Sequence, residues 1–351
     1  MNNTDIIEKI TDKIRGSKNF IVTSHTSPDG DNIGSSIAMT LFLRKLEKKA
    51  WHVLDDSVPE NLRFLLDEPG RRAMDESDMR GRCHRIYTSE EFLATETGRA
   101  LAQSGDYVLI ILDTADESRI CVSSEIWENA SFTINIDHHV SNRGYADFNH
   151  IEPEASSTCE VLCSILRSID EKKFTPQIAT AVYTGISTDT GNFLYDSVDA
   201  HTFENASFLT KMGADRDTVA NRIYQSTSYD YLRLTKESLD TLEVDDSVGI
   251  MILTMDMLER NNVDYKDTDS LVNNVINING VRVAILIKER GRGEYKISLR
   301  SKDATNVCEI AARFGGGGHK RAAGCSMNGD LDTVVSQIKE AAKEQICITD
   351  L

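Results

Sequence analysis

The sequence of 351 residues has no long apolar run and is poor in proline and aromatic residues. It contains five prolines, and aromatic residues make up 7% of the chain. No apolar segment approaches the roughly 20 residues needed to span a bilayer, and the polar N-terminus does not resemble a secretory signal. We therefore expect a cytoplasmic protein with no membrane partner. Its 40% hydrophobic and 27% charged residues are typical of a globular fold.

Cysteine is sparse, and its pattern favours neither disulfides nor a zinc site. The seven cysteines are scattered along the chain. Cys159 and Cys163 lie four residues apart, but no second pair completes a set of zinc ligands. We expect all seven to be reduced thiols, which suits a reducing compartment.

Positive charge is also in short supply, because 39 basic residues face 56 acidic ones and the net charge is −17. Proteins that bind long nucleic acids usually carry a basic surface that neutralises phosphates. A chain this acidic would repel a long duplex, so an anionic substrate should be small and held locally. The same acidity could serve solubility alone, and the sequence leaves both explanations open.

The first half of the chain alternates strand and helix patterns. Apolar runs predict strands at 20–23, 107–112 and 132–136, and a helix is expected at 34–46. Buried strands between helices predict an α/β domain, a parallel sheet with helices on both faces, over residues 1–225. Sheets of this kind bind ligands at the carboxyl ends of their strands. Polar residues of this sequence gather at those ends.

The rest of the chain predicts several helices and then a second, smaller α/β domain. The helices are expected at 157–167, 176–187, 200–212, 215–224 and 229–242. Residues 226–246 are expected to form a helical linker, with a polar break at 243–247. The second domain, 247–351, shows strands at 248–254, 281–289, 294–300 and 322–327 and helices at 306–314 and 332–345. We expect a cleft between the two domains.

Four segments rich in aspartate and histidine point to the chemistry. They are His25–Asp31, Asp113, Asp137-His138-His139 and Asp189. Aspartate and glycine are common in turns, and Asp113 could be a helix N-cap. However, three consecutive metal-capable residues at the end of a buried strand would be costly to desolvate without a cation. Together the four segments predict a site for two divalent cations.

The order of these segments resembles that of the DHH phosphoesterase superfamily. The resemblance rests on His25–Asp31 with Gly34-Ser35, Asp113-Thr114, Asp137-His138-His139 and Thr188-Asp189-Thr190-Gly191. Arg300-Ser301, the run Gly315–Gly318 with His319, and Ala322–Gly324 resemble the DHH-associated C-terminal domain. The resemblance covers nearly the whole chain, and the two-domain layout is similar to the nano-RNase/pAp-phosphatase (NrnA-like) branch.

The resemblance implies a dinuclear site, usually of manganese, with Mg²⁺ or Co²⁺ as alternatives. It implies that His25, Asp29 and Asp113 hold one ion and that Asp31, Asp113, His138 and Asp189 hold the other. Independently, carboxylates and imidazoles without thiolates suit Mn²⁺. Such a pair of ions activates water for attack on phosphorus. The expected catalytic residues are Asp113, His138 and His139, the last of which would contact phosphate or assist the leaving group.

The run Gly315–Gly318 has two explanations. Four glycines can form a flexible linker, but here they precede His319 in an acidic chain, and exposed N–H groups suit an anion. The resemblance implies that Arg300, Ser301 and His319 bind a phosphate that is not cleaved. Further substrate contacts are expected from Gly316, Gly317, Gly318, Ser157 and Thr158, although the two hydroxyl residues could simply cap a helix.

The leading hypothesis is an enzyme, a metal-dependent hydrolase that releases mononucleotides from short oligonucleotides and dephosphorylates 3'-phosphoadenosine 5'-phosphate (pAp). The first alternative is a soluble phosphodiesterase for cyclic di-AMP, cyclic di-GMP or their linear products pApA and pGpG. Inorganic pyrophosphatase and long single-strand exonuclease activities are disfavoured by the glycine-rich motif and by the charge. A non-catalytic nucleotide-binding regulator is the alternative from another class, and the complete ligand set argues against it. A homodimer is one alternative for the assembly.

Overall fold

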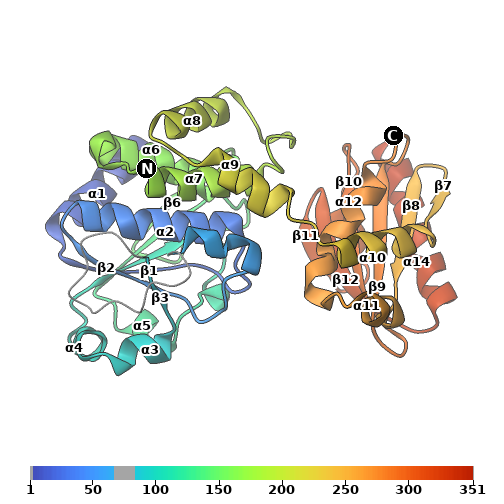
Figure 1. The fold of residues 1–351 in the computed structure, drawn as a ribbon, viewed down its shortest axis with the longest axis horizontal. Coiled ribbons are helices and arrows are strands. Elements are labelled where there is room, and N and C mark those ends of the chain that lie inside the picture. Colours follow the sequence, from blue (N-terminus) through green and yellow to red (C-terminus); the bar gives the residue numbers. More distant parts are fainter. Residues whose placement is uncertain (1–2, 67–83, 351) are drawn as a thin grey trace. The chain divides into compact units, whose positions relative to one another are not determined.

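The computed structural model describes residues 3–66 and 84–350 of the chain. They fold into two compact units, Met1–Ser226 and Thr227–Leu351 (Figure 1). Each unit has its own six-stranded sheet and its own hydrophobic core. The α/β class predicted for both halves of the chain is confirmed. Within the described ranges, no helix combines the length and apolarity required to cross a membrane.

A parallel sheet forms the centre of the first unit. Its strands follow the order β3-β2-β1-β4-β5-β6, and each neighbouring pair is parallel. The strands are β1 Asn19–Thr23, β2 Lys49–Val53, β3 Ile86–Tyr87, β4 Val108–Leu112, β5 Phe132–Asp137 and β6 Phe148–Ile151. All of β4 is buried, as expected of a strand covered on both faces. β2, β3 and β6 were not predicted, because they are short and mix polar with apolar residues.

Helices cover both faces of this sheet, as predicted (Figure 1). On one side lie α1 Asn3–Gly16, α2 Gly30–Lys45, α6 Thr158–Asp170 and α7 Pro176–Asp189, and α8 Ala200–Lys211 packs on α6 and α7. The other face carries α3 Ser89–Ala94, α4 Glu96–Ser104 and α5 Ser124–Glu128. The segment predicted as one helix at 215–224 is α9 Arg216–Val219 followed by a π-helical turn, Ala220–Tyr224. Short 3₁₀ turns lie at Glu60–Leu65, Glu117–Arg119 and Glu171–Lys173.

Helices α2, α6 and α7 pack closely because glycine occupies the contacts between them. A Cβ atom added to Gly34 of α2 would lie 2.4 Å from the Ala181 carbonyl oxygen of α7. A Cβ added to Gly185 of α7 would lie 2.2 Å from Cys159 Sγ of α6 and 2.7 Å from Asp31 Oδ1. These separations are shorter than van der Waals contact, so only glycine fits. The backbones of the three helices therefore approach one another directly.

The second unit is built on a mixed sheet with strand order β11-β12-β10-β9-β8-β7, in which only β8 and β9 are parallel. The strands are β7 Glu243–Asp245, β8 Val248–Leu253, β9 Val283–Gly291, β10 Glu294–Ser301, β11 Gly317–His319 and β12 Ala322–Asn328. One face packs against α13 Val307–Ala312 and α14 Leu331–Thr349. The other packs against α10 Tyr229–Leu239, α11 Met255–Asn261, η6 Tyr265–Leu271 and α12 Val272–Ile276.

Two segments of the second unit differ from the simple loops expected of them. The polar segment 243–247 contains β7, which pairs with β8. The helix α10, which lies in the expected linker 226–246, packs against the sheet of the second unit. The glycine run contributes its last two glycines to β11, which pairs with β12. Both strands lie at the edges of the sheet, where strands are often short and polar. Because β7 and β11 lack alternating apolar residues, the sequence showed no strand pattern for either.

The cysteines of the described residues are all free thiols, in agreement with the prediction. They are Cys121, Cys159, Cys163, Cys308, Cys325 and Cys347. Cys83, for which the same state was predicted, lies outside the described residues.

Two histidines are buried together at the edge of the parallel sheet. His52 of β2 and His84 hydrogen-bond through Nδ1 and Nε2, 3.0 Å apart, and within the described part of the chain the other nitrogen of each ring has no partner. Burial lowers the pKa of His52 to about 3. Burial, together with the charges of His52 and Arg44, also lowers the pKa of His84 well below its usual value. Both rings are therefore neutral in the folded protein near pH 7.

We predict that this histidine pair makes the fold sensitive to acid. Below about pH 6.5 the unfolded chain binds protons at both rings and the folded chain does not, so acid favours unfolding. The free energy of unfolding should fall by up to about 1.4 kcal/mol per histidine per pH unit. Denaturant titrations of the full chain between about pH 7 and pH 5 measure this dependence.

Two variants separate this effect from the protonation of carboxylates. The double variant His52→Gln/His84→Gln should show a shallower dependence on pH. His201→Gln should keep the parent slope, because the His201 side chain is 52% exposed and lies outside the buried pair. Equal slopes for the parent and both variants would contradict the prediction.

Candidate metal centre

The carboxyl edge of the parallel sheet gathers the predicted site residues of the first unit. His25 follows β1, Asp113 follows β4, and His138 and His139 follow β5. Asp189 is the last residue of α7. The helix predicted at 34–46 already begins at Gly30, as α2, so it includes the end of the segment His25–Asp31. Its tight turn is thus the start of a helix, which aspartate and glycine also favour.

Asp29 and Asp31 have different positions at the start of α2. Asp29 is the N-cap, and its Oδ1 accepts hydrogen bonds from the backbone N–H groups of Asp31 (3.1 Å) and Asn32 (3.0 Å). Asp31 lies in the first helical turn and is 1% exposed. Both carboxylates lie at the positive end of the helix dipole, which favours negative charge.

The structure brings the six predicted metal ligands of the first unit together. His25, Asp29 and Asp113 form one group of possible ligands, and Asp31, His138 and Asp189 form another. Asp113 lies between them, because its Oδ2 is 3.3 Å from His25 Nε2 and its Oδ1 is 3.9 Å from His138 Nε2. His138 Nε2 also lies 3.3 Å from Asp189 Oδ2.

Hydrogen bonds fix the tautomers of two histidines. His25 Nδ1 donates to the Thr26 carbonyl oxygen at 2.7 Å, and His138 Nδ1 donates to the Ala155 carbonyl oxygen at 3.3 Å. A carbonyl only accepts, so the proton of each neutral ring is on Nδ1. Both Nε2 atoms face the carboxylates, to which they donate while protonated, and each could bind a metal once that proton is lost.

Asp31 is held by backbone N–H groups at the start of α6. Its carboxylate accepts hydrogen bonds from Thr158 N at 2.6 Å and from Cys159 N at 2.8 Å. Even so, burial and repulsion by Asp113 and Asp189 raise the pKa of Asp31 well above its usual value. Carboxylates this close together repel one another, most strongly where they are buried as Asp31 and Asp113 are, and a cation among them would remove the cost.

Asp113 is the best-compensated carboxylate of the group. Burial alone would raise its pKa, but the hydrogen bond from His25 and the charges of nearby histidines outweigh burial and lower the pKa of Asp113 to about 2. The Thr158 hydroxyl donates to its Oδ1 at 2.9 Å. Its backbone has a φ of 54°, an angle that aspartate and asparagine tolerate better than most residues. Asp113 thus stays ionised and faces both groups of ligands.

The donor atoms fit hard divalent cations. They are carboxylate oxygens and imidazole nitrogens, the ligands that Mn²⁺ and Mg²⁺ share with other first-row metals. Cys159 is near, but burial and the adjacent Asp31 raise the pKa of its thiol well above the usual value. A neutral thiol does not compete as a ligand. The cluster therefore suits cations of the manganese or magnesium type.

The imidazole of His139 is oriented by a hydrogen bond to the Asp137 carboxylate. Its Nδ1 donates to Asp137 Oδ1 at 2.7 Å, and it lies 3.7 Å from Asp113 Oδ1. Burial lowers the pKa of His139, but Asp137 and Asp113 raise it more, to about 9. Its ring could also join Asp113 and His138 as a ligand group.

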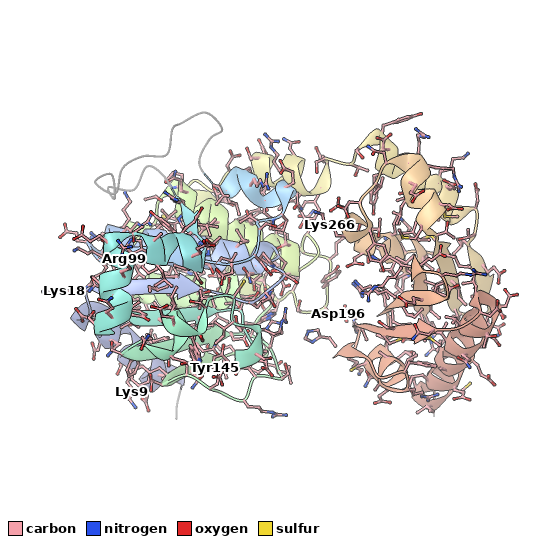
Figure 2. The ribbon with its side chains drawn as sticks, turned by 90° about the horizontal axis from the view of Figure 1, so that it is seen from below. Lys9, Lys18, Arg99, Tyr145, Asp196 and Lys266 are labelled. Carbon is pink, nitrogen blue, oxygen red and sulfur yellow. The ribbon has the colours of Figure 1, made fainter. Side chains whose placement is uncertain are left out.

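Sequence reasoning missed the residues that hold Asp137. Asp137 is fully buried, and Asn142 Nδ2 donates to its Oδ2 at 2.6 Å and to Asn135 Oδ1 at 2.7 Å. Tyr145, which is labelled in Figure 2, extends this network: its hydroxyl accepts from Asn135 Nδ2 at 3.2 Å and donates to the Thr114 carbonyl oxygen at 2.9 Å. Asparagine and tyrosine are frequent everywhere, so no local pattern distinguished this network.

Ser157 and Thr158, predicted to contact substrate, have roles inside the protein. The Ser157 hydroxyl accepts from Glu160 N at 3.0 Å and caps α6, as the simpler explanation held. Thr158 is fully buried and positions Asp31 and Asp113. Contact of either residue with substrate stays a prediction.

In the second unit the strand register places Arg300 and His319 on one face of the sheet. Both residues pair with Ala322, Arg300 from β10 and His319 from β11. Neighbouring strands lie about 4.8 Å apart, so the two Cα atoms are about 10 Å apart. Ser301 alternates to the other face, where its hydroxyl donates to the Thr305 carbonyl oxygen at 2.8 Å. This placement does not support the contact with phosphate predicted for Ser301.

The glycines before His319 differ in the space around them. A Cβ on Gly317 would meet no atom within 4 Å. A Cβ on Gly316 would lie 2.1 Å from the Gly324 carbonyl oxygen, and one on Gly318 would lie 2.5 Å from that of Ala322. Gly316 and Gly318 are therefore required for packing, whereas nothing in the fold requires glycine at position 317.

Comparison with known proteins covers both units. Residues 19–186 match the model of the DHH family N-terminal domain, and residues 247–345 match that of the DHHA1 domain. Asp189 lies just beyond the first match. A Thermus thermophilus protein named bifunctional oligoribonuclease and PAP phosphatase NrnA is 30% identical over 327 residues, which cover 93% of this chain and 89% of the relative.

Two further similarities support the same grouping. A Streptococcus mutans protein named as a probable bifunctional oligoribonuclease and PAP phosphatase NrnA is 32% identical over 220 residues, 62% of this chain and 69% of the relative. A crystal structure of an exopolyphosphatase-related protein from Bacteroides fragilis superposes with a TM-score of 0.84 at 26% identity, over 99% of this chain and 98% of that one.

We predict that Asp113→Asn removes cation binding without unfolding the protein. Asparagine tolerates the backbone angle and can still accept the Thr158 hydroxyl, but it cannot balance a cation's charge. Mn²⁺ at about 100 times its Kd should raise the Tm of the parent by about 5–10 °C and leave that of the variant unchanged. Hydrolysis of bis(p-nitrophenyl) phosphate should fall by about 1,000-fold.

The matched control is Asp116→Asn, on the same segment but outside the cluster. Asp116 is an exposed cap whose Oδ1 accepts from Ser118 N at 2.8 Å. This variant should keep both the Mn²⁺-dependent rise in Tm and the activity. If Mn²⁺ did not raise the Tm of the parent, the cluster would not be a metal centre.

A second prediction separates the structural and ligand-binding roles of the glycines. Gly317→Ala should leave the Tm unchanged and weaken binding of pAp in the presence of a chelator by several-fold, because a methyl group would obstruct the backbone N–H groups. Gly318→Ala should lower the Tm, because a side chain at its φ of 144° costs about 1–3 kcal/mol. Unchanged pAp binding by Gly317→Ala in calorimetric titrations would count against an anion site here.

Proposed function

The chain belongs to the DHH family of phosphoesterases and carries a DHHA1 domain, and on this basis we propose that it degrades short oligonucleotides to mononucleotides and dephosphorylates pAp. Similarity over nearly the whole length to a relative named oligoribonuclease and PAP phosphatase carries this proposal. The cluster of six ligands in the first unit supports hydrolysis over mere binding, since every carboxylate and imidazole that the chemistry needs is present.

The metal centre would take two divalent cations, with Mn²⁺ as the expected pair. His25, Asp29 and Asp113 would hold one, and Asp31, Asp113, His138 and Asp189 would hold the other. Cations at such a site supply Lewis acidity that generates a nucleophile from water and offsets charge on phosphate. The remaining work falls to the chain's own side chains.

Asp113 keeps the site charged. Its low pKa means that it carries a negative charge across the physiological range, so it can hold two positive groups together. Asp31 and Asp189 belong to the second group of ligands, and the backbone N–H groups of Thr158 and Cys159 hold the Asp31 carboxylate in position. Because backbone groups do this, the ligand geometry exists before substrate arrives.

His139 would act on the phosphate itself. Its ring is oriented by the hydrogen bond to Asp137, and this carboxylate favours the protonated ring by raising its pKa. A protonated imidazole can donate to a phosphate oxygen or to the departing oxygen. Asp137 and Asn142 have the role of holding this ring, which they perform from a fully buried position.

The second unit would bind a phosphate that is not cleaved. Arg300 and His319 lie on one sheet face beside the exposed glycines of β11. A guanidinium offers paired donors that match a phosphate, and exposed backbone N–H groups add more. Such a site would favour nucleotides over pyrophosphate or phosphate esters without a second phosphate.

Turnover on a panel of substrates tests the proposal. We predict that the full chain with Mn²⁺ hydrolyses pApA, a five-nucleotide RNA and pAp, that a chelator stops all three reactions, and that pyrophosphate is cleaved far more slowly. Chromatography of the products measures each rate. Cleavage of pyrophosphate alone would indicate a pyrophosphatase, and nucleotide binding without turnover on any substrate would indicate a regulator.

A further inference from the structure

A cluster of lysines lies on the same sheet face as Arg300 and His319. Lys296 of β10 lies opposite Lys288 of β9 in the register, and Arg300 lies opposite Ala284 four residues further along each strand. Both lysines contact Asp269 of η6, the short helix that also carries Lys266 (Figure 2). Lys288 is in close contact with this carboxylate, and Lys296 Nζ lies 3.0 Å from its Oδ2. Two ammonium groups therefore share one carboxylate.

Lys288 is the permanent partner of Asp269. Its side chain is 0% exposed, and its Nζ also donates to Thr268 Oγ1 at 3.1 Å and lies 4.2 Å from the centre of the Tyr265 ring. A buried ammonium without its counter-charge is strongly destabilising. The Asp269 charge is thus committed to Lys288, whatever happens at the surface.

Lys296 is the surplus cation of the cluster. Its side chain is 31% exposed, and its Nζ lies 3.2 Å from Asp269 Oδ1 and 3.0 Å from Asp269 Oδ2. With Lys288 and Lys296 each at +1 and Asp269 at −1, the cluster carries a net charge of +1. A phosphodiester carries −1, so one such group would neutralise the cluster without displacing Lys288.

The spacing from Lys296 to Arg300 separates the two as binding points. Four residues of strand correspond to about 13 Å between the Cα atoms. The ends of both side chains are also held apart, because Lys296 bonds to Asp269 and Arg300 donates to the Leu299 carbonyl oxygen at 3.0 Å. One phosphate could not contact both groups in these positions.

The surface between the two points carries small side chains. Ser298 of β10 pairs with Gly324 of β12, which in turn pairs with Gly317 of β11. This register row lies between the row of Arg300 and that of Lys296. Ser298 is only 7% exposed and pairs on its other side with Leu286 of β9. A nucleotide between the two points would therefore lie over Gly324 and Gly317, which carry no side chains.

We propose that Lys296 binds a further phosphate of an oligonucleotide, beyond the one at Arg300 and His319, and so makes the protein favour substrates with at least three phosphates. This inference rests on the proposed function, because it assumes that Arg300 and His319 hold a nucleotide phosphate. The second unit would then select substrates by their number of phosphates.

Binding measured without turnover tests the inference. The full chain is titrated with 3'-fluorescein-labelled pApA and pApApA in the presence of a chelator, and affinity is followed by fluorescence anisotropy over a range of salt concentrations. The parent should bind pApApA about 5- to 10-fold more tightly than pApA. Lys296→Gln should remove this difference and leave pApA binding unchanged.

The salt dependence gives an independent measure. Each phosphate contact on a single strand contributes about 0.7 to the slope of log affinity against log salt. The parent slope should therefore be steeper by about 0.7 for pApApA than for pApA, and Lys296→Gln should make the two slopes equal. Lys296→Arg should restore most of the difference, because arginine keeps the charge.

Lys339→Gln is the matched control. Lys339 lies on α14, over the other face of the same sheet, where it is 23% exposed and 3.0 Å from Asp245 Oδ2. This variant should bind both nucleotides as the parent does. Equal affinities and slopes of the parent for the two nucleotides would overturn the inference, as would equal weakening of both by Lys296→Gln.

The outcome is separable from that of the proposed function. If the parent binds pApApA with the extra slope but hydrolyses no oligonucleotide with Mn²⁺, the proposed function fails and the phosphate site stands. If it hydrolyses oligonucleotides but shows no effect of Lys296 on length, the function stands and the site fails. Should Lys296→Gln not fold, the difference in slope within the parent decides.

Discussion

Mutual repulsion among aspartates is the constraint on which the first unit depends. Asp29, Asp31, Asp113 and Asp189 come from three parts of the chain and lie around two imidazoles, and Asp31 and Asp113 are buried. Nothing in an isolated sheet or helix would hold them there. The fold does so with helix termini, which attract negative charge, with backbone N–H groups at the start of α6, and with histidines whose tautomers are fixed. A scaffold that stabilises so much negative charge is arranged for cations.

The two units concentrate charges of opposite sign. The first concentrates carboxylates, whereas the second displays Arg300, His319 and Lys296 on one sheet face in a chain of net charge −17. Local positive charge within an acidic protein limits attraction to short anions, because a longer polyanion would also meet the acidic surface. The lysine cluster illustrates such local positive charge. The charges of Lys288 and Asp269 neutralise each other, so the partly exposed Lys296 provides the net positive charge.

The sequence predicted the parts of the site that lie within single segments. Apolar runs located β1, β4 and β5, and the polar residues after them were recognisable because strand ends of a parallel sheet bind ligands. What failed depended on contacts between distant segments. No local pattern tells that Asn142 holds Asp137, that Lys288 and Lys296 share Asp269, or that His319 extends a strand. Similarly, Asp29 and Gly30 are ambiguous between a loop and a helix start until α7 packs against them.

The glycine contacts between α2, α6 and α7 also bear on ion selectivity. Asp31 lies in the first turn of α2 and Asp189 is the last residue of α7, and the two helices meet at Gly34, which lies against the backbone of Ala181 and Gly185. The distance between the two carboxylates is consequently a property of backbone packing. Calcium forms bonds of about 2.3–2.6 Å to six to eight oxygens, whereas magnesium requires about 2.0–2.1 Å. A larger ion, were it bound between Asp31 and Asp189, would therefore act against the contact between the helices as well as against the ligands themselves.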